Sequence, residues 1–174
     1  MRFTELPLKG TYLIEPQPHE DSRGFFARTF CAQEFSDQAL VGRIVQCNTS
    51  WNAVAGTVRG LHYQEFPACE VKLVRCTSGS LWDVIVDIRP GSPTYLEHVA
   101  IELSAKNRIS LYIPEMFAHG FQTLEHETEV FYQMSEYYAP ELSVGLRYDD
   151  PKLGINWPRP VSAISERDLK HPLL

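Results

Sequence analysis

Short runs of alternating apolar and polar residues recur along the whole chain, and turn-forming residues separate them. Val, Ile, Tyr and Phe dominate the runs, whereas Gly, Pro, Ser and Asn fill the gaps. Many short strands at this spacing are typical of a β-sandwich or a β-barrel. The pattern predicts strands at Gly24–Phe30, Thr57–Tyr63, Cys69–Cys76, Leu81–Ile88, His98–Leu103, Ile109–Ile113, Ala118–Thr123 and Thr128–Met134.

Helical patterns are scarce. The segment Gln33–Ala39 predicts one short helix, and Ser165 followed by Asp168 resembles a capping box that opens a final helical turn. There is no repeat, low-complexity tract or linker, and 174 residues suit one domain with a core of its own. The sequence therefore predicts a single all-β domain, residues 1–174, with a few short helices.

The two faces of one predicted strand, Leu81–Ile88, differ in character. Alternation puts only apolar side chains on the first face, which we expect to pack in a core. The second face sets carboxylates beside apolar residues, as a polar pocket inside a barrel requires. The first face consists of Trp82, Val84, Val86 and Ile88, and the second of Leu81, Asp83, Ile85 and Asp87.

The composition of the chain limits which partners the protein can bind and in which cellular compartment it is expected. A net charge of −6 argues against a general nucleic-acid binder, although it leaves room for a basic pocket for one phosphorylated ligand. The N-terminus does not resemble a signal peptide, and no apolar run is long enough to span a bilayer. The four cysteines form no CxxC pair. We therefore expect reduced thiols in a cytoplasmic protein with no membrane partner.

Two histidines, His62 and His119, lie inside apolar, strand-like segments, where a buried imidazole needs a polar partner. A lone histidine in such a place is most often a satisfied core residue, and this interpretation stays open for His119. For His62, neighbouring strands offer Lys72, Asp83 and Tyr132 as inward polar groups. A base, a cation and a phenol in one pocket can move protons next to a carbonyl group.

Strict alternation would place Arg59 and His62 on opposite faces of one strand. If both side chains serve one pocket, the strand needs an extra residue between them. Gly60 is the position at which we expect such a β-bulge.

An ordered set of short motifs extends from about Gly10 to the C-terminus. They are Asp21–Phe26, Arg59–Gln64, Lys72–Arg75, Asp83–Arg89, Ser92–Thr94, Ile113–Pro114, Phe117–Phe121, Asp149–Pro151, Trp157–Pro158 and Ser165–Asp168. The set resembles the dTDP-4-dehydrorhamnose 3,5-epimerases, a metal-free branch of the cupin-type jelly rolls. The resemblance implies an all-β jelly-roll barrel that acts on a nucleotide-linked 4-keto sugar without a cofactor.

The resemblance also implies catalytic roles. In this family a base removes a proton beside the C4 ketone, and an acid returns one on the opposite face of the ring. His62 matches the base and Asp168 its partner, Tyr132 matches the acid, and Lys72 matches the cation near the enolate oxygen. Asp83 is expected to support this network.

Substrate-binding residues carry over in the same way. Arg23 and Arg59 match diphosphate contacts, because guanidinium groups bind phosphate oxygens bidentately. Further positions are expected near the sugar, the base or the catalytic groups: Phe26, Gln46, Asn48, His119 and Tyr137. The family is usually dimeric with exchanged N-terminal strands, so Arg23, Phe26 and Arg28 are expected to reach the pocket of the neighbouring subunit.

Arg28 departs from the family pattern, which has a thymine-reading Glu at this position. A carboxylate accepts hydrogen bonds from a base, whereas a guanidinium only donates them. The departure leaves open whether Arg28 reads cytosine or guanine instead, or faces solvent.

Three other functions stay open on the sequence. One is a single-centre 3- or 5-epimerase acting on a CDP- or GDP-sugar, and another is a sugar-binding module without catalysis. The third is a metal-dependent cupin enzyme. The HxH motif of metal cupins is missing, since Tyr63 and Gln64 follow His62. One histidine with scattered carboxylates is too few ligands for a tight transition-metal site, so we expect no metal.

Overall fold

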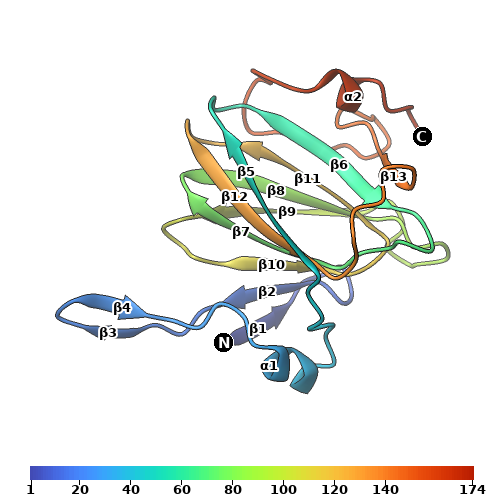
Figure 1. Cartoon of the computed structure of the whole chain (residues 1–174). Coiled ribbons are helices and arrows are strands. Elements are labelled where there is room, and N and C mark those ends of the chain that lie inside the picture. The colour runs from blue at the N-terminus through green and yellow to red at the C-terminus, as the bar shows by residue number, and fades with distance from the viewer.

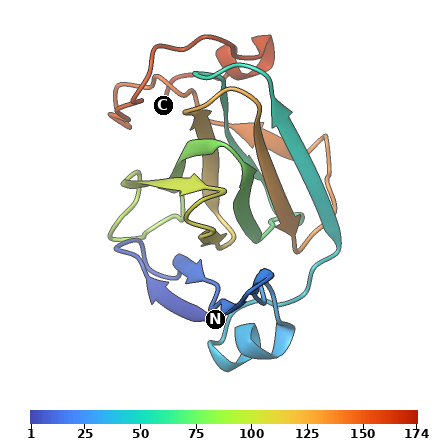
Figure 2. The same ribbon diagram turned by 90° about the vertical axis from the view of Figure 1, so that its left-hand side faces the viewer.

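A computed structural model describes residues 1–174, and nearly all of its regular structure is antiparallel β-sheet. Two sheets face each other (Figures 1 and 2). In spatial order, the six-stranded sheet consists of β1 (Arg2–Glu5), β2 (Tyr12–Glu15), β10 (Ser110–Ile113), β7 (Lys72–Ser78), β12 (Thr128–Met134) and β5 (Gln46–Asn52). The five-stranded sheet consists of β13 (Ser143–Gly145), β6 (Val58–Gln64), β11 (Phe117–Thr123), β8 (Ser80–Asp87) and β9 (His98–Ser104).

Two short helices and one hairpin complete the fold. The hairpin of β3 (His19–Asp21) and β4 (Gly24–Phe26) projects away from the barrel (Figure 1). Helix α1 (Ala32–Asp37) lies at the end near the N-terminus, and α2 (Glu166–Leu169) lies at the opposite end (Figure 2). Neither helix is long and apolar enough to cross a membrane. The prediction of an all-β, cupin-type jelly-roll barrel with a few short helices is confirmed.

The alternation of apolar and polar residues in the sequence predicted most strands with apolar faces and missed most strands that are largely polar. The predicted strand at Gly24–Phe30 is wrong beyond Phe26, because β4 pairs only with β3 and no barrel strand extends the pairing. The strand predicted from Cys69 begins only at Lys72. Five strands carried no signal that we used: β1, β2, β3, β5 and β13. β3 reads His-Glu-Asp and β5 is largely polar, so neither shows apolar alternation.

Strand β8 is buried on both faces, whereas the sequence predicted a polar pocket along one of them. Its inward residues Leu81 and Ile85 pack between the sheets with Val74 and Val130. Its outward residues pack in a second cluster beneath the C-terminal part of the chain, namely Val84, Val86 and Ile88 against Leu61, Leu146 and Leu153. The core fills part of the interior, and both polar and apolar side chains line the space that remains between the sheets.

The carboxylate at the end of β8 fixes the loop that follows. Asp87 is fully buried and accepts hydrogen bonds from Arg89, Ser92 and Thr94. Burial raises the pKa of this carboxyl group, but the hydrogen bonds more than offset that effect and hold the pKa far below its usual value. Asp87 therefore holds this loop and lies apart from the polar interior that the sequence suggested.

We expect Asp87→Asn to lower the free energy of unfolding by about 1.5–3 kcal/mol at neutral pH, since it removes charged hydrogen bonds. The folded pKa lies below the unfolded value of about 3.9, so this stabilisation is present above that value. It is lost as the pH falls, and the difference between the two proteins should narrow below about pH 4. Urea unfolding at several pH values measures it.

Asp149→Asn is the matched control, because Asp149 forms an exposed pair with Arg147. Exposed pairs contribute about 0–1 kcal/mol, so this variant should remain close to the wild type. An equal loss in both variants would contradict the structural role of Asp87.

Candidate active site

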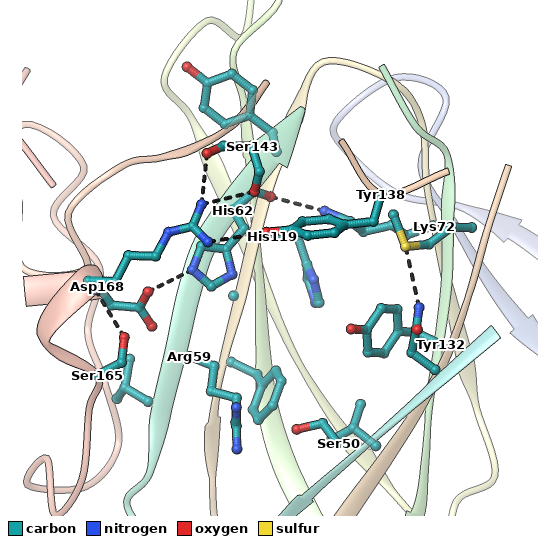
Figure 3. A pocket seen from close by; sticks show the side chains of 18 of the residues that line it. Ser50, Arg59, His62, Lys72, His119, Tyr132, Tyr138, Ser143, Ser165 and Asp168 are labelled. Carbon is teal, nitrogen blue, oxygen red and sulfur yellow. Dashed lines mark hydrogen bonds and ion pairs between the residues drawn. The ribbon is translucent and has the colours of Figure 1, made fainter. Parts of the chain in front are cut away.

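A cleft of about 820 Å³ opens between the two sheets, beside α2 (Figure 3). Strands β5, β7 and β12 form one wall, β6 and β11 form the other, and the segment 163–168 closes one side. Because side chains alternate along a strand, every second residue of β5 and β12 points inward. The inward residues on this wall include Gln46, Asn48, Ser50, Val130, Tyr132 and Met134.

The wall formed by β6 depends on a β-bulge. His62 pairs with His119 and Arg59 pairs with Phe121, so β6 advances three residues where β11 advances two. The extra residue brings both Arg59 and His62 into the cleft and confirms the bulge predicted at Gly60. Gly60 has a φ of +118°, and a side chain there would lie 2.5 Å from Cα of Gly120. Only glycine fits this position.

His62 and Asp168 form a hydrogen-bonded pair across 106 residues of sequence, with Nε2 2.8 Å from Oδ1 (Figure 3). Nδ1 of His62 has no protein partner and is free to meet a ligand in the cleft. Burial raises the pKa of Asp168, but the hydrogen bond and charge of His62 outweigh this and leave the pKa below its usual value. The carboxylate therefore stays charged and can stabilise an imidazolium at His62.

Helix α2 positions Asp168. Ser165 caps the helix and accepts a hydrogen bond from the backbone N–H of Asp168 at 3.1 Å. The carboxylate does not return to Ser165, as a full capping box requires. It accepts instead from the Gly60 backbone N–H at 3.2 Å and pairs with His62. Only one of the two hydrogen bonds of a capping box is therefore formed, because the carboxylate of Asp168 binds His62 and Gly60 instead.

Tyr132 faces His62 from the opposite sheet (Figure 3). It lies on β12 between Val130 and Met134, and burial raises the pKa of its hydroxyl group. A nearby positive charge on Arg59 opposes this shift without cancelling it. Tyr132 is therefore protonated near neutral pH and can donate a proton from its side of the cleft.

Lys72 is a buried cation with a dedicated counter-ion. Its Nζ lies 2.7 Å from Oε1 of Glu70 and donates to the carbonyl oxygen of His62 at 3.1 Å. Glu70 also accepts from the Gln64 backbone N–H at 3.1 Å. The sequence analysis assigned a role to Lys72 but none to Glu70. Glu70 lies two residues before Lys72 in the strand predicted at Cys69–Cys76, so alternation on one face was the available signal.

A second His–Asp pair lies deeper in the same wall. His119 lines the cleft, and its Nε2 lies 3.0 Å from Oδ2 of the fully buried Asp83. Burial raises the pKa of Asp83, and His119 offsets this effect only in part. Asp83 does not line the cleft itself, so it acts on the site through His119.

The expected binding residues divide into two groups. Gln46, Asn48 and Arg59 line the cleft, and Arg59 also donates to Asn52 at 2.7 Å. Tyr137 was expected there, but its side chain lies outside the lining and is 62% exposed. The next residue, Tyr138, lines the cleft instead. The tyrosine expected in the cleft is therefore Tyr138 and not Tyr137.

The N-terminal candidates lie far from the cleft of their own chain. Arg23 and Phe26 are on the exposed β3–β4 hairpin, where Arg23 pairs with Asp21. Arg28 follows the hairpin and pairs with Glu34 at 2.7 Å. None of the three residues lines the cleft.

Two further residues near the cleft were missed. Arg167 donates to the Tyr138 hydroxyl oxygen at 3.4 Å and thereby lowers the pKa of that tyrosine. His171 lies behind the dyad, with Nε2 3.9 Å from Oδ1 of Asp168. The sequence analysis counted only one histidine as a possible metal ligand, and the structure places His171 beside His62 as a second one. The three-residue spacing from Asp168 to His171 on a helical turn was the available signal.

The fold and the cleft define a class of enzyme. A base paired with a carboxylate on one wall and a protonated phenol on the other can carry protons to and from two faces of a substrate. A jelly-roll barrel with these groups is suited to an isomerase that inverts a carbon centre.

Comparisons with known proteins agree. The family model described as dTDP-4-dehydrorhamnose 3,5-epimerase matches residues 5–174. A relative of that name from Sinorhizobium fredii is 44% identical over 100% of this chain and 90% of its own. The dTDP-4-dehydrorhamnose 3,5-epimerase of Bacillus anthracis, solved with TDP and PPi bound, is 38% identical with a TM-score of 0.96 over 99% of both chains.

A Legionella pneumophila epimerase, solved with dTDP-4-keto-L-rhamnose, is 36% identical with a TM-score of 0.92 over 99% of this chain and 92% of its own. The chain belongs to the dTDP-4-dehydrorhamnose 3,5-epimerase family, whose members are isomerases.

We expect neutral His62 to carry its proton on Nε2, because Nε2 faces the charged carboxylate of Asp168. Nitrogen-15 NMR of the imidazole, assigned with His62→Gln, distinguishes the two tautomers. Asp168→Asn should allow the other tautomer, since its amide nitrogen can donate to Nε2. A proton on Nδ1 in the wild type would contradict the assignment of Nδ1 as the free base.

Proposed function

We propose that the chain inverts C3 and C5 of a nucleotide-linked 4-keto-6-deoxy sugar, converting dTDP-4-dehydro-6-deoxyglucose to dTDP-4-dehydrorhamnose. The observation that carries this proposal is the placement of His62 and Tyr132 on opposing sheets of one cleft. A sugar ring between them has its two faces toward a base and an acid. The relatives with bound dTDP ligands support the choice of substrate.

The chemistry follows from the ketone. A carbonyl group at C4 acidifies the protons at C3 and C5, so Nδ1 of His62 can remove one of them as a general base. Asp168 then stabilises the resulting imidazolium. The hydroxyl group of Tyr132 returns a proton to the opposite face, which inverts the centre. Each inversion leaves the sugar's composition unchanged.

Lys72 is proposed to stabilise the negative charge that builds up on the enolate oxygen. It lines the cleft near His62, and Glu70 holds its ammonium group in place. A fixed charge in a partly closed site stabilises a developing anion more than water does. His119, supported by Asp83, adds a polar group to the wall on the side of the base.

Binding of the nucleotide is proposed to involve both subunits of a homodimer. The β3–β4 hairpin projects from the barrel with Phe25 48% and Phe26 75% exposed. Exposed aromatic residues on a projecting hairpin favour an exchange in which Arg23, Phe26 and Arg28 reach the neighbouring cleft. Arg59, Gln46 and Asn48 would then meet the same ligand from within the chain.

The remaining parts of the proposal concern the whole chain. Residues 1–174 are proposed to act as one catalytic domain in the cytoplasm. All four cysteines are free thiols, which supports a reducing compartment.

Incubation with dTDP-4-keto-6-deoxyglucose in heavy water tests the reaction. We expect deuterium at both C3 and C5, followed by NMR, together with formation of the rhamnose product. His62→Ala should lose at least ~10²-fold in exchange, as removal of a general base does. Tyr132→Phe should still exchange but lose inversion by a similar factor, because the proton then returns to the face from which it left.

The outcomes separate the alternatives. Deuterium at one carbon would show a single-centre epimerase, and undiminished exchange in His62→Ala would contradict the base assignment. Exchange with a CDP- or GDP-sugar alone would contradict the proposal that the substrate carries a thymidine nucleotide. No exchange with any of the three sugars would contradict the proposal that the protein is an epimerase.

Arg59 tests the binding of the diphosphate. We expect Arg59→Ala to raise KM by about 10–100-fold with a smaller change in kcat, because a charged hydrogen bond to a part of the substrate that does not react is lost. Arg147→Ala is the control, because Arg147 pairs with Asp149 outside the cleft. An unchanged KM in Arg59→Ala would remove this residue from the binding site.

A further inference from the structure

Three side chains with metal-binding atoms converge behind the wall of the cleft. His62, Asp168 and His171 each offer one ligand atom, and these atoms lie within 4.8 Å of one another. Asp168 Oδ1 lies 2.8 Å from Nε2 of His62 and 3.9 Å from Nε2 of His171. The proposed reaction uses the first two residues and leaves His171 without a role.

His171 is unusual for an imidazole that is mostly buried. Its side chain is 12% exposed, and its buried Nε2 has no hydrogen-bond partner. A buried polar atom without a partner costs free energy, so it normally finds one. Oδ1 of Asp168 lies 3.9 Å from this nitrogen, too far for a hydrogen bond, and it is already engaged by His62. A ligand between the three side chains would satisfy Nε2 of His171.

The spacing of the three atoms suits a small divalent cation. Zinc binds imidazole nitrogen and carboxylate oxygen at about 2.0–2.2 Å, so tetrahedral ligand atoms lie about 3.3–3.6 Å apart. The two separations of 2.8 and 3.9 Å lie on either side of that range. All three ligand atoms lie within 4.8 Å of one another, so small side-chain shifts would bring both histidines onto one ion, and a water molecule would complete the coordination.

The surroundings hold the carboxylate and the second imidazole in place. The Gly60 backbone N–H donates to the other oxygen of Asp168 at 3.2 Å, which fixes the orientation of the carboxylate. His171 fits because residue 145 is glycine: a side chain there would lie 2.5 Å from Nε2. These contacts orient both residues before any ion binds.

We propose that His62, Asp168 and His171 form a site for Zn²⁺ and that zinc bound there inhibits the enzyme reversibly. Zinc would take the lone pair of Nε2 of His62, and the proton of that nitrogen would move through solvent to Nδ1. Nδ1 would then carry a proton and accept none from the sugar. The inhibition rests on the proposed function, but the site itself does not.

Direct binding tests the site without any substrate. We expect isothermal titration of the metal-free protein with ZnCl₂ to show one zinc ion per chain, and Co²⁺ to give the visible absorption of a tetrahedral site. His171→Asn should weaken zinc binding at least 10-fold. His171→Leu, which keeps a similar volume without a nitrogen, should do the same. His126→Asn, at an exposed loop position, is the matched control and should bind as the wild type does.

Inhibition is then measured as the zinc concentration that halves each protein's own rate of deuterium exchange. His171→Asn should need at least 10-fold more zinc than the wild type, and His126→Asn the same amount. Absence of zinc binding by the wild type, or wild-type zinc affinity in both His171 variants, would overturn the site. Binding without inhibition would overturn the inhibitory role. Binding by a protein that exchanges none of the sugars would overturn the proposed function alone.

Discussion

The hydrogen bond between His62 and Asp168 is the interaction on which the cleft depends. It joins the middle of β6 to α2 near the C-terminus, and it is possible only because β6 contains an extra residue. That bulge turns His62 into the cleft and frees the Gly60 backbone N–H, which binds the second oxygen of Asp168. One irregularity in the sheet thus orients the base and anchors its partner at the same time.

The barrel gives the phenol of Tyr132 and the carboxylate partner of His62 different electrostatic surroundings. Burial alone raises the pKa of a carboxyl group and of a phenol. At Asp168 the imidazole of His62 reverses this effect, so the group stays ionised. At Tyr132 the charge on Arg59 is too weak to reverse it, so the hydroxyl group keeps its proton. The two walls therefore hold opposite protonation states near neutral pH, as inversion at a carbon centre requires.

Sequence patterns predicted the parts of the molecule that are set by apolar burial. Strand β12 was located to the residue, and the core face predicted for β8 is buried, but its second face packs in the core between the sheets instead of lining a polar pocket. The patterns failed at β5, because its inner face lines a polar cleft, and beyond Phe26, because the hairpin has no barrel neighbour. Predicting the bulge at Gly60 was possible only because two polar residues had to share one side of the strand.

The site residues show the same division. His62, Lys72 and Tyr132 lie on predicted strands, and the motif resemblance marked their roles. Glu70 precedes the observed strand β7 and His171 follows α2, and the importance of both follows from contacts with Lys72 and Asp168 that only the folded chain reveals. Tyr137 was named from the resemblance alone, and it lies beyond the last residue of β12, where alternation does not indicate which way a side chain points.

The properties that suit an imidazole to general-base catalysis also make it a good metal ligand. A general base near neutral pH needs an accessible lone pair on a neutral imidazole, and a carboxylate partner makes it more effective. The same neutral imidazole and carboxylate are preferred zinc ligands, so such a dyad already supplies two of the three protein ligands of a zinc site. His171 supplies the third ligand within 3.9 Å of the carboxylate. The proposed sensitivity to zinc is thus a consequence of how the base is activated, and His171 determines how tightly zinc binds.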